Sequence, residues 1–292
     1  GNGLFIYNPK EDELQHFSTA DKDPLFHSNF LLNVFIDRSG CIWICTGDGV
    51  YCCRELKDLN TEHVKIEPAS NREWSNHVRH ISNIGNDRLA VTTRANMTYI
   101  YNTRTQQRTV EMQTDACVYD YAIDPQGRKW IATKGGGIYI DGVRYWKYEK
   151  EHYAPGIAFY KTIFDKQGRA WIATWGEGLL ITPQKTSQQP RKFEQFLNAD
   201  GKEAQIHDLL LDRKGRLWIC SNNGILMVNT AEKKITAQKF LRFSDENGKL
   251  PVSEINSGIE AHDGKLWFAA TGGILKCSYN EKTQELEYEL FD

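Results

Sequence analysis

The chain of 292 residues is 40% hydrophobic and 12% aromatic, and its 36 basic residues against 38 acidic ones leave a net charge of −2. This content of apolar and aromatic side chains excludes a disordered chain and is enough for a sizeable core. The near-zero net charge gives no reason to expect a nucleic-acid partner, because tight binding to phosphates needs a clustered excess of Lys and Arg. No apolar run approaches the roughly 18 residues that a membrane span needs.

The seven cysteines are odd in number and form no CxxC pair. This pattern argues against a zinc site and against a disulfide framework, but it leaves a single disulfide open. The first residues, Gly1-Asn2-Gly3, contain no Met and no signal-peptide pattern, so we expect the chain to be part of something longer.

In chain order, the first predicted elements are two short strands, at residues 1–10 and 14–17. A repeated pattern follows them, with good copies at residues 36–46, 123–133, 164–174, 212–221 and 262–270. Each copy carries a tryptophan, namely Trp43, Trp130, Trp171, Trp218 or Trp267. The first interval between these tryptophans is about twice the others, so a degenerate copy is predicted at residues 81–93, with Ala90 in place of the tryptophan.

Each copy predicts a β-hairpin followed by two more strands. An apolar strand ends in Asp-x-x-Gly, where the Asp side chain can accept backbone N–H groups and the Gly can take a positive φ. A second strand carries the tryptophan, and a third and fourth strand follow. Four antiparallel strands every 40 to 50 residues form the blade of a β-propeller.

The fold class is therefore all-β, a β-propeller of six four-stranded blades plus an outer half-blade. The two opening strands match the third and fourth strands of a blade, so its two inner strands are expected from residues outside this chain, in a ring of seven blades. We expect residues 1–292 to form a single propeller domain. The repeated Asp, Gly and Trp are interpreted as turn and packing residues, and not as a metal loop.

The motif Asp-x-x-Gly-x-x-Trp-Ile-x-Thr, followed by Gly-Gly and Ile or Leu, resembles the two-component regulator propeller repeat. That repeat builds the extracytoplasmic sensor region of bacterial hybrid two-component sensor histidine kinases. The resemblance implies a periplasmic, ligand-sensing propeller whose ligand is an oligosaccharide and whose kinase lies outside this chain. It also implies three kinds of partner, namely a neighbouring propeller, a sandwich domain of the same protein and a second copy in a homodimer. No cofactor, metal or catalytic residue is predicted.

A ligand face is predicted where the first strand of each blade begins and the second ends, since antiparallel strands place these two points together. Six first-strand positions, aligned on the turn glycine, are all polar, and the positions after the second strand vary from blade to blade. Constant packing residues combined with variable residues on one face are typical of a binding site presented on loops. Polar residues are, however, also tolerated at the hydrated mouth of any propeller channel. The predicted ligand-binding residues are His80, Arg94, Asp120, Lys134, Tyr160, Lys161, Trp175, Asp208 and Asn222.

An aromatic segment, Tyr145 to Gly156, adds weight to sugar recognition, because aromatic rings pack on the C–H faces of pyranoses. Two alternatives remain. One is an enzyme like the streptogramin lyases, whose repeats look similar and which would need a histidine near the channel, such as His80 or His207. The other is a passive platform for protein interaction.

Overall fold

The computed structural model describes residues 3–8, 10–37, 39–54, 61–67, 74–144, 158–182, 194–196 and 205–291. The chain divides into two compact units, Gly1–Tyr121 and Ala122–Asp292, and the division falls within strand β11 (Val118–Ile123). A single domain over residues 1–292 stays a prediction. Within the described residues, no helix is long and apolar enough to cross a membrane.

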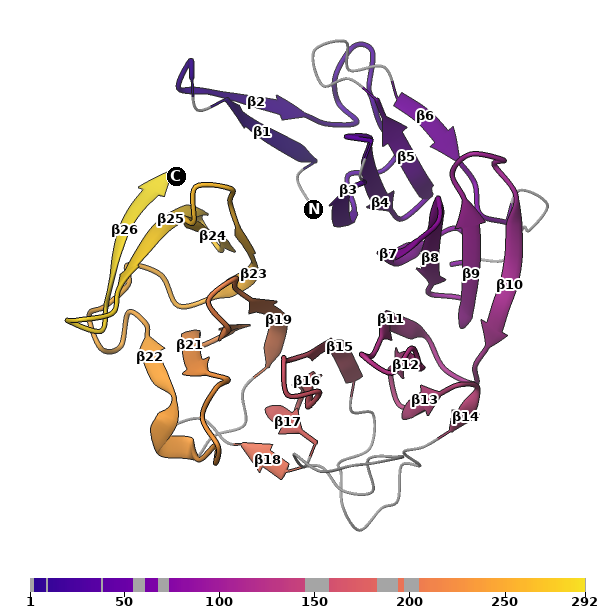
Figure 1. Cartoon of the computed structure of the whole chain (residues 1–292). Coiled ribbons are helices and arrows are strands. Elements are labelled where there is room, and N and C mark those ends of the chain that lie inside the picture. The colour runs from indigo at the N-terminus through magenta and orange to yellow at the C-terminus, as the bar shows by residue number, and fades with distance from the viewer. Residues whose placement is uncertain are drawn as a thin grey trace. The chain divides into compact units, whose positions relative to one another are not determined.

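The first unit holds a hairpin, two complete blades and the start of a third (Figure 1). The hairpin is β1 (Leu4–Asn8) and β2 (Glu13–Phe17). Blade 1 is β3 (Leu31–Ile36), β4 (Ile42–Thr46), β5 (Gly49–Cys53) and β6 (Thr61–Val64). Blade 2 is β7 (Val78–Gly85), β8 (Arg88–Thr93), β9 (Met97–Asn102) and β10 (Arg108–Gln113).

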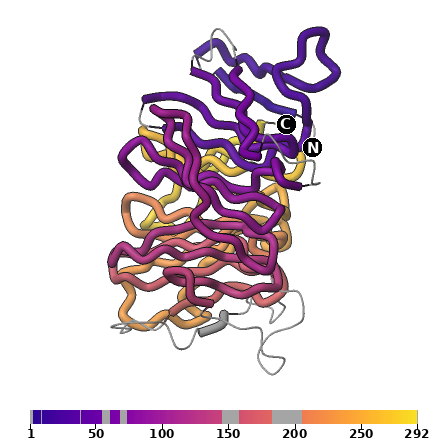
Figure 2. Tube along the Cα trace, turned by 90° about the vertical axis from the view of Figure 1, so that its right-hand side faces the viewer, coloured from indigo at the N-terminus to yellow at the C-terminus, as the bar shows by residue number. Residues whose placement is uncertain are grey.

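The second unit holds the remaining strands, and Figure 2 traces the same succession of hairpins along the Cα path. Blade 3 is β11, β12 (Lys129–Thr133), β13 (Ile138–Ile140) and β14 (Val143–Arg144). Blade 4 is β15 (Ala158–Phe164), β16 (Ala170–Trp175), β17 (Leu179–Ile181) and β18 (Glu194–Phe196). Blade 5 is β19 (Ile206–Leu211), β20 (Arg216–Ser221), β21 (Gly224–Asn229) and β22 (Leu241–Phe243), with a 3-10 turn at Ala237–Lys239. Blade 6 is β23 (Ile255–Glu260), β24 (Leu266–Ala270), β25 (Gly273–Asn280) and β26 (Glu285–Phe291).

The predicted fold class is confirmed. Six four-stranded sheets have their strands in chain order, and β1 pairs with β2 in a two-stranded sheet. Neighbouring strands pair antiparallel, as β15 does with β16 and β19 with β20, and each of the five tryptophans lies in the second strand of its blade. The core consists of apolar layers between successive sheets of a unit, such as the layer in which Trp171 of blade 4 packs with Leu217 of blade 5. The count of seven blades in a ring stays a prediction.

The Asp-x-x-Gly turns form as the sequence predicts. In blade 3, Gly127 has a φ of 82° and its N–H donates to the carbonyl of Asp124 over 2.9 Å. Oδ1 of Asp124 accepts the N–H groups of Gln126 and Arg128 over 3.0 and 2.8 Å. The same backbone bond closes the turns that begin at Asp37, Asp165 and Asp212. A positive φ is favourable for glycine because it carries no Cβ.

The degenerate copy is also confirmed. Ser82 of β7 pairs with Ala90, just as Leu210 pairs with Trp218 in blade 5, so Ala90 occupies the tryptophan position. The β7–β8 hairpin closes through Asn86 and Asp87, which both have a positive φ. Two consecutive positive φ values define the type I′ turn, which Asn and Asp tolerate better than most residues.

The Asp of the turn has a second role that the sequence analysis missed. In blade 4, the indole N–H of Trp171 donates to Oδ2 of Asp165 over 2.7 Å, and Trp171 is fully buried. The same bond joins Asp37 to Trp43, Asp124 to Trp130 and Asp212 to Trp218. It satisfies the polar atom of a buried indole, which would otherwise cost free energy.

Blade 6 departs from this arrangement, because Ala261 stands where the other blades have the Asp. Trp267 is only partly buried and stacks on Phe291, with ring centroids 5.9 Å apart. The turn of blade 6 therefore has no Asp side chain at the position that holds the indole in blades 1, 3, 4 and 5.

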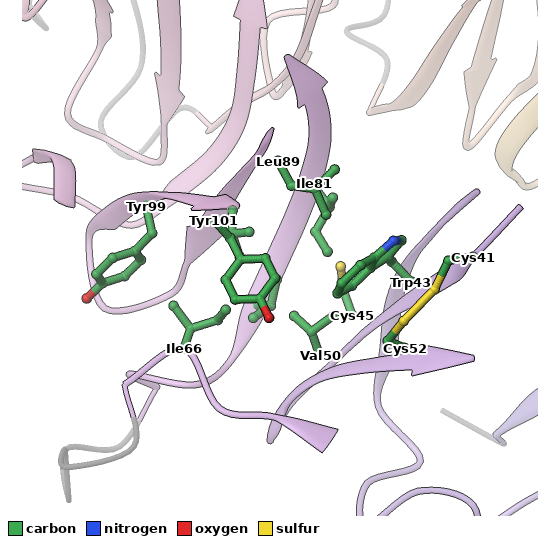
Figure 3. Packing of buried hydrophobic residues seen from close by; sticks show 12 residues of the cluster. Cys41, Trp43, Cys45, Val50, Cys52, Ile66, Ile81, Leu89, Tyr99 and Tyr101 are labelled. Atoms are coloured by element: carbon green, nitrogen blue, oxygen red, sulfur yellow. A yellow bond between two sulfur atoms is a disulfide. The ribbon is translucent and has the colours of Figure 1, made fainter. Parts of the chain in front are cut away.

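Two cysteines form the single disulfide that the sequence leaves open. Cys41 and Cys52 are joined within blade 1, where both are buried beside Trp43 (Figure 3). The other five cysteines are not part of a disulfide within the described residues, namely Cys45, Cys53, Cys117, Cys220 and Cys277.

Reduction of this disulfide is expected to lower the free energy of unfolding by about 3 kcal/mol, since the bond closes a short loop, with 11 residues of separation, in the unfolded chain. Urea unfolding with and without reductant measures the loss. The Cys41→Ser/Cys52→Ser variant should show the same loss and no further response to reductant. Equal stability of the oxidised and reduced protein would contradict the expectation.

Candidate ligand-binding face

The backbone joins the two sets of predicted positions at one end of each blade. In blade 2, the N–H of Arg94, just after the second strand, donates to the carbonyl of His77, just before the first, over 3.0 Å. Equivalent bonds of 2.9 to 3.1 Å join Gly47 to Phe30, Asn222 to Gln205 and Thr271 to Glu254. We call this end of a blade the loop face.

The first-strand positions lie deeper than the sequence predicts. His80 is the third residue of β7, and Asp208 is the third residue of β19. In five blades the pairing register shifts just before this position, so that one residue forms a β-bulge. A bulge redirects neighbouring side chains, which the alternation of a regular strand does not predict. The bulged residues are Leu32, Arg79, Tyr160, His207 and Asn256.

In the first unit, His80 and Asp120 contact each other. Nε2 of His80 lies 3.1 Å from Oδ1 of Asp120, which is 3% exposed, and 2.8 Å from Oγ of Ser82. Nδ1 of His80 lies 3.4 Å from Nδ2 of Asn33, and the Ser82 hydroxyl donates to the carbonyl of Tyr121. These polar groups therefore satisfy one another across neighbouring strands.

In the second unit, Lys161 and Asp208 form an ion pair. Oδ1 of Asp208 also accepts the N–H of Leu209 over 2.9 Å, and Oδ2 accepts the N–H of Gly258 over 3.1 Å. The carboxylate is buried, and its charge is balanced within the protein. Because Lys161 is held in this pair, it contributes less to attraction of an acidic ligand than its sequence position suggests.

Trp175 is the exposed centre of an aromatic group on the loop face of the second unit. The sequence places it in a loop, but it is the last residue of β16, where it pairs with Ala158. Its side chain is 43% exposed, and its ring lies edge-on to those of Tyr160 and His207, with centroids 6.0 and 6.4 Å apart. Tyr160 and His207 are both bulged residues, so the bulges bring these rings beside Trp175.

Arg94 also lies beside an exposed tryptophan, in the first unit. Its guanidinium carbon lies 4.1 Å from the ring centroid of Trp74, which is 42% exposed. The sequence analysis missed Trp74 because it belongs to no repeat copy. Trp74 lies three residues before His77, whose carbonyl accepts the N–H of Arg94 on this face. This short spacing is the signal that could have identified Trp74.

The remaining predicted residues are exposed on the loop face. Lys134 forms a backbone bridge with Ala158, and the side-chain oxygen of Asn222 accepts the N–H of Gln205 over 3.1 Å. Six of the nine predicted residues therefore contact one another in pairs that the sequence did not predict, namely His80 with Asp120, Lys161 with Asp208, and Tyr160 with Trp175. The aromatic segment Tyr145 to Gly156 lies outside the described residues. The described residues hold no group of three or more His, Cys, Asp or Glu that could bind a metal ion.

His77 is buried beneath this face, where burial and then the nearby charges of Arg94 and Arg79 lower its pKa to about 4. The unfolded chain binds a proton near pH 6.5, whereas the folded chain stays neutral until about pH 4. Stability should therefore fall as the pH drops through this window, by roughly 2 to 3 kcal/mol.

Urea unfolding at pH 7.5 and pH 4.5 measures this loss for the wild type. The variant His77→Gln cannot titrate, so it should lose less stability between these two pH values. An identical loss in both proteins would assign the acid sensitivity to other groups.

The comparisons with known proteins agree with the repeat and the fold. Residues 200–223, which include the Asp212 turn and Trp218, match the two-component regulator propeller family. The extracellular domain of a protein assigned as a hybrid two-component system of B. thetaiotaomicron, BT3049, superposes with a TM-score of 0.71 at 21% identity, over 94% of this chain and 36% of that one. A second such domain from B. thetaiotaomicron, BT4673, gives 0.52 at 16% identity, over 98% and 38%.

Streptogramin B lyase gives a TM-score of 0.67 at 11% identity, over 91% of this chain and 85% of the enzyme. No curated protein matches the chain in sequence. At these identities the likenesses show the fold alone, and the chain spans little more than a third of the two extracellular domains. The resemblance inferred from the repeats is thus confirmed: the chain is a β-propeller, and its residues 200–223 match the two-component regulator propeller repeat.

Proposed function

We propose that this chain is a ligand-sensing propeller of a hybrid two-component sensor, that its ligand is an oligosaccharide, and that the signal passes to a kinase outside this chain. The repeat match at residues 200–223 supports the sensor class. Oligosaccharide recognition is argued from the exposed side chains of the loop face.

The observation that carries the ligand proposal is the exposure of Trp175 between Tyr160 and His207. Leaving a large aromatic ring in water has no benefit for folding, whereas its face can pack on the C–H face of a sugar. Tyr160 and His207 supply polar groups at the edge of the ring, where sugar hydroxyls would lie. Trp74 with Arg94 offers a similar combination in the first unit.

A periplasmic location is part of the same proposal. The disulfide between Cys41 and Cys52 supports it, because disulfides persist in oxidising compartments. The proposed partners are a neighbouring propeller and a sandwich domain of the same protein, with homodimerisation of the receptor. The ligand signals by its difference in affinity for the two receptor states.

Titration calorimetry on the complete extracytoplasmic region, with oligosaccharides from different polysaccharides, tests the proposal. Trp175→Ala and Arg94→Ala should weaken binding of the cognate sugar with little change in melting temperature, because exposed residues rarely affect stability by more than about 0.5 kcal/mol. Tyr288→Ala and Arg104→Ala are matched controls, since Tyr288 in β26 is 45% exposed and Arg104 lies exposed in the turn between β9 and β10. Unchanged affinity in both test variants would contradict the proposed site.

A lyase is the second candidate, favoured by the extent of the fold likeness to streptogramin B lyase and by the contact between His80 and Asp120. A carboxylate beside an imidazole can orient it for proton transfer. Metal-dependent turnover of a streptogramin B compound, lost in His80→Ala, would support this candidate over the sensor. Binding of oligosaccharides without turnover of a streptogramin would favour the sensor over the lyase. Oligosaccharide binding would also favour the sensor over a passive platform for protein interaction.

A further inference from the structure

In three blades, an arginine side chain contacts both the turn Asp and the tryptophan that is hydrogen-bonded to it. In blades 3, 4 and 5, the residue four positions after the turn Asp is an arginine whose Nε donates to Oδ2 of that Asp over 2.6 to 2.7 Å. Its guanidinium lies 5.5 to 5.8 Å from the ring centroid of the tryptophan. A guanidinium held by a carboxylate and an indole face gains both a charge-assisted hydrogen bond and a cation–π contact. The arginines are Arg128, Arg169 and Arg216.

Blade 5 shows what surrounds such a guanidinium. Arg216 lies 5.5 Å from the ring of Trp218 and 5.1 Å from the ring of Tyr279, which belongs to the third strand of blade 6. Its Nη1 lies 3.3 Å from Oε1 of Glu281. Trp218 and Tyr279 meet edge to face, with ring centroids 5.5 Å apart.

Blade 1 has the same Asp and Trp side chains but no arginine beside them. The indole of Trp43 still donates to Oδ2 of Asp37 over 2.9 Å, but Cys41 takes the arginine position and is tied back to Cys52. Trp43 meets Tyr101, from the third strand of blade 2, edge to face with centroids 5.9 Å apart (Figure 3). Tyr101 thus makes the ring contact with Trp43 that Tyr279 makes with Trp218, although by strand register Tyr101 aligns with Cys277.

A cavity of about 300 Å³ opens at this place. Its lining includes Asp37, Trp43, Cys52, Glu62, Tyr101 and the exposed Arg54. The cavity therefore occupies the position that an arginine side chain takes in the other blades, with the carboxylate and the two aromatic rings in place.

The charges of the cavity favour a cation. Burial acts to raise the pKa of Asp37, but hydrogen bonds from the Ser39 hydroxyl, the Trp43 indole and the backbone outweigh it, so the pKa is lowered and the carboxylate is ionised at neutral pH. Glu62 adds a second carboxylate close enough to contribute to the raised pKa of Tyr101, after the larger effect of burial. Among the described residues of the lining, Arg54 is the single cationic side chain.

We propose that this cavity binds a guanidinium group from outside the chain. Asp37 accepts its N–H groups, and its plane lies against Trp43 and Tyr101. A guanidinium is preferred over an ammonium because it is planar, less strongly hydrated and able to stack on aromatic rings while it donates to a carboxylate. The group belongs either to a free small molecule or to the arginine of another polypeptide segment.

Calorimetric titration of the oxidised protein with n-butylguanidine, a small monovalent guanidinium, and with an acetylated Gly-Arg-Gly amide tests the proposal. We expect binding of butylguanidine that is at least tenfold tighter than that of butylamine, its ammonium counterpart of equal charge. Tighter binding of the peptide than of butylguanidine would assign the group to a polypeptide, and the reverse would assign it to a small molecule. No binding of either probe, or equal binding of butylamine, would overturn the proposal.

Variants separate the cavity from other sites. Asp37→Asn keeps an oxygen acceptor for the indole and should weaken butylguanidine binding at least tenfold, whereas Glu13→Gln, on the exposed β2, removes the same charge elsewhere and should leave binding unchanged. Cys41→Arg/Cys52→Ser should fill the cavity with its own guanidinium and abolish binding, while Cys41→Ser/Cys52→Ser retains it. The filled variant should also melt at a higher temperature than the serine variant, a readout that is independent of any ligand. Retained binding in the filled variant would place the guanidinium elsewhere.

Discussion

Replacement of Trp171 by alanine is expected to lower the free energy of unfolding by about 3 to 5 kcal/mol, the range for deletion of a large buried aromatic side chain. Trp171 is fully buried between blades 4 and 5, and its indole N–H donates to Asp165 over 2.7 Å. The substitution creates a cavity between two sheets and leaves the carboxylate with one donor fewer. Chemical denaturation followed by circular dichroism measures the loss.

Trp175 provides the internal control, because the two tryptophans are in the same strand. Trp175→Ala should cost far less, since the side chain is 43% exposed and its ring contacts are edge-on. Comparable losses from the two substitutions would mean that the end of β16 is more deeply packed in solution than its exposure indicates. A small loss from Trp171→Ala would instead question the role of the tryptophans as packing residues.

The blades could be predicted from sequence because each one is specified locally. The Asp-x-x-Gly turn and the tryptophan recur within a single hairpin, so turn chemistry and strand length set the register without knowledge of the rest of the chain. Even the copy without a tryptophan was predicted, from the doubled interval between Trp43 and Trp130, and in the structure Asn86 and Asp87 make an equivalent tight turn between its strands. Because the same unit recurs along the chain, a pattern that is weak in one copy was sufficient to predict the fold.

The site residues were harder to predict because their contacts are not local. Lys161 and Asp208 are 47 residues apart, and the sequence does not show that each one neutralises the other. The bulges at Tyr160 and His207 are set by pairing between strands, so alternation alone predicted neither their direction nor the group they form with Trp175. Trp74 was missed for a related reason, since its exposure depends on how the segment before blade 2 folds.

The largest electrostatic effect is expected from Asp165→Ala, at about 3 to 5 kcal/mol, because removal of one partner leaves a buried charge uncompensated. Arg169 is 3% exposed and Asp165 is 2% exposed. Oδ2 of Asp165 accepts Nε of Arg169 over 2.7 Å, and its Oδ1 accepts two backbone N–H groups of the turn.

Asp37 offers the matched comparison, since it makes the same turn and indole bonds without a guanidinium. Asp37→Ala should therefore cost about 1 to 3 kcal/mol, the range for buried donors left without an acceptor. The double variant Asp165→Ala/Arg169→Met should be more stable than Asp165→Ala alone, because it removes the stranded charge together with its partner. Urea unfolding of the four proteins measures both differences. Equal losses from Asp165→Ala and Asp37→Ala, with no recovery in the double variant, would show that the carboxylate acts through the turn and the indole, and that the arginine contributes nothing to the stability of the blade.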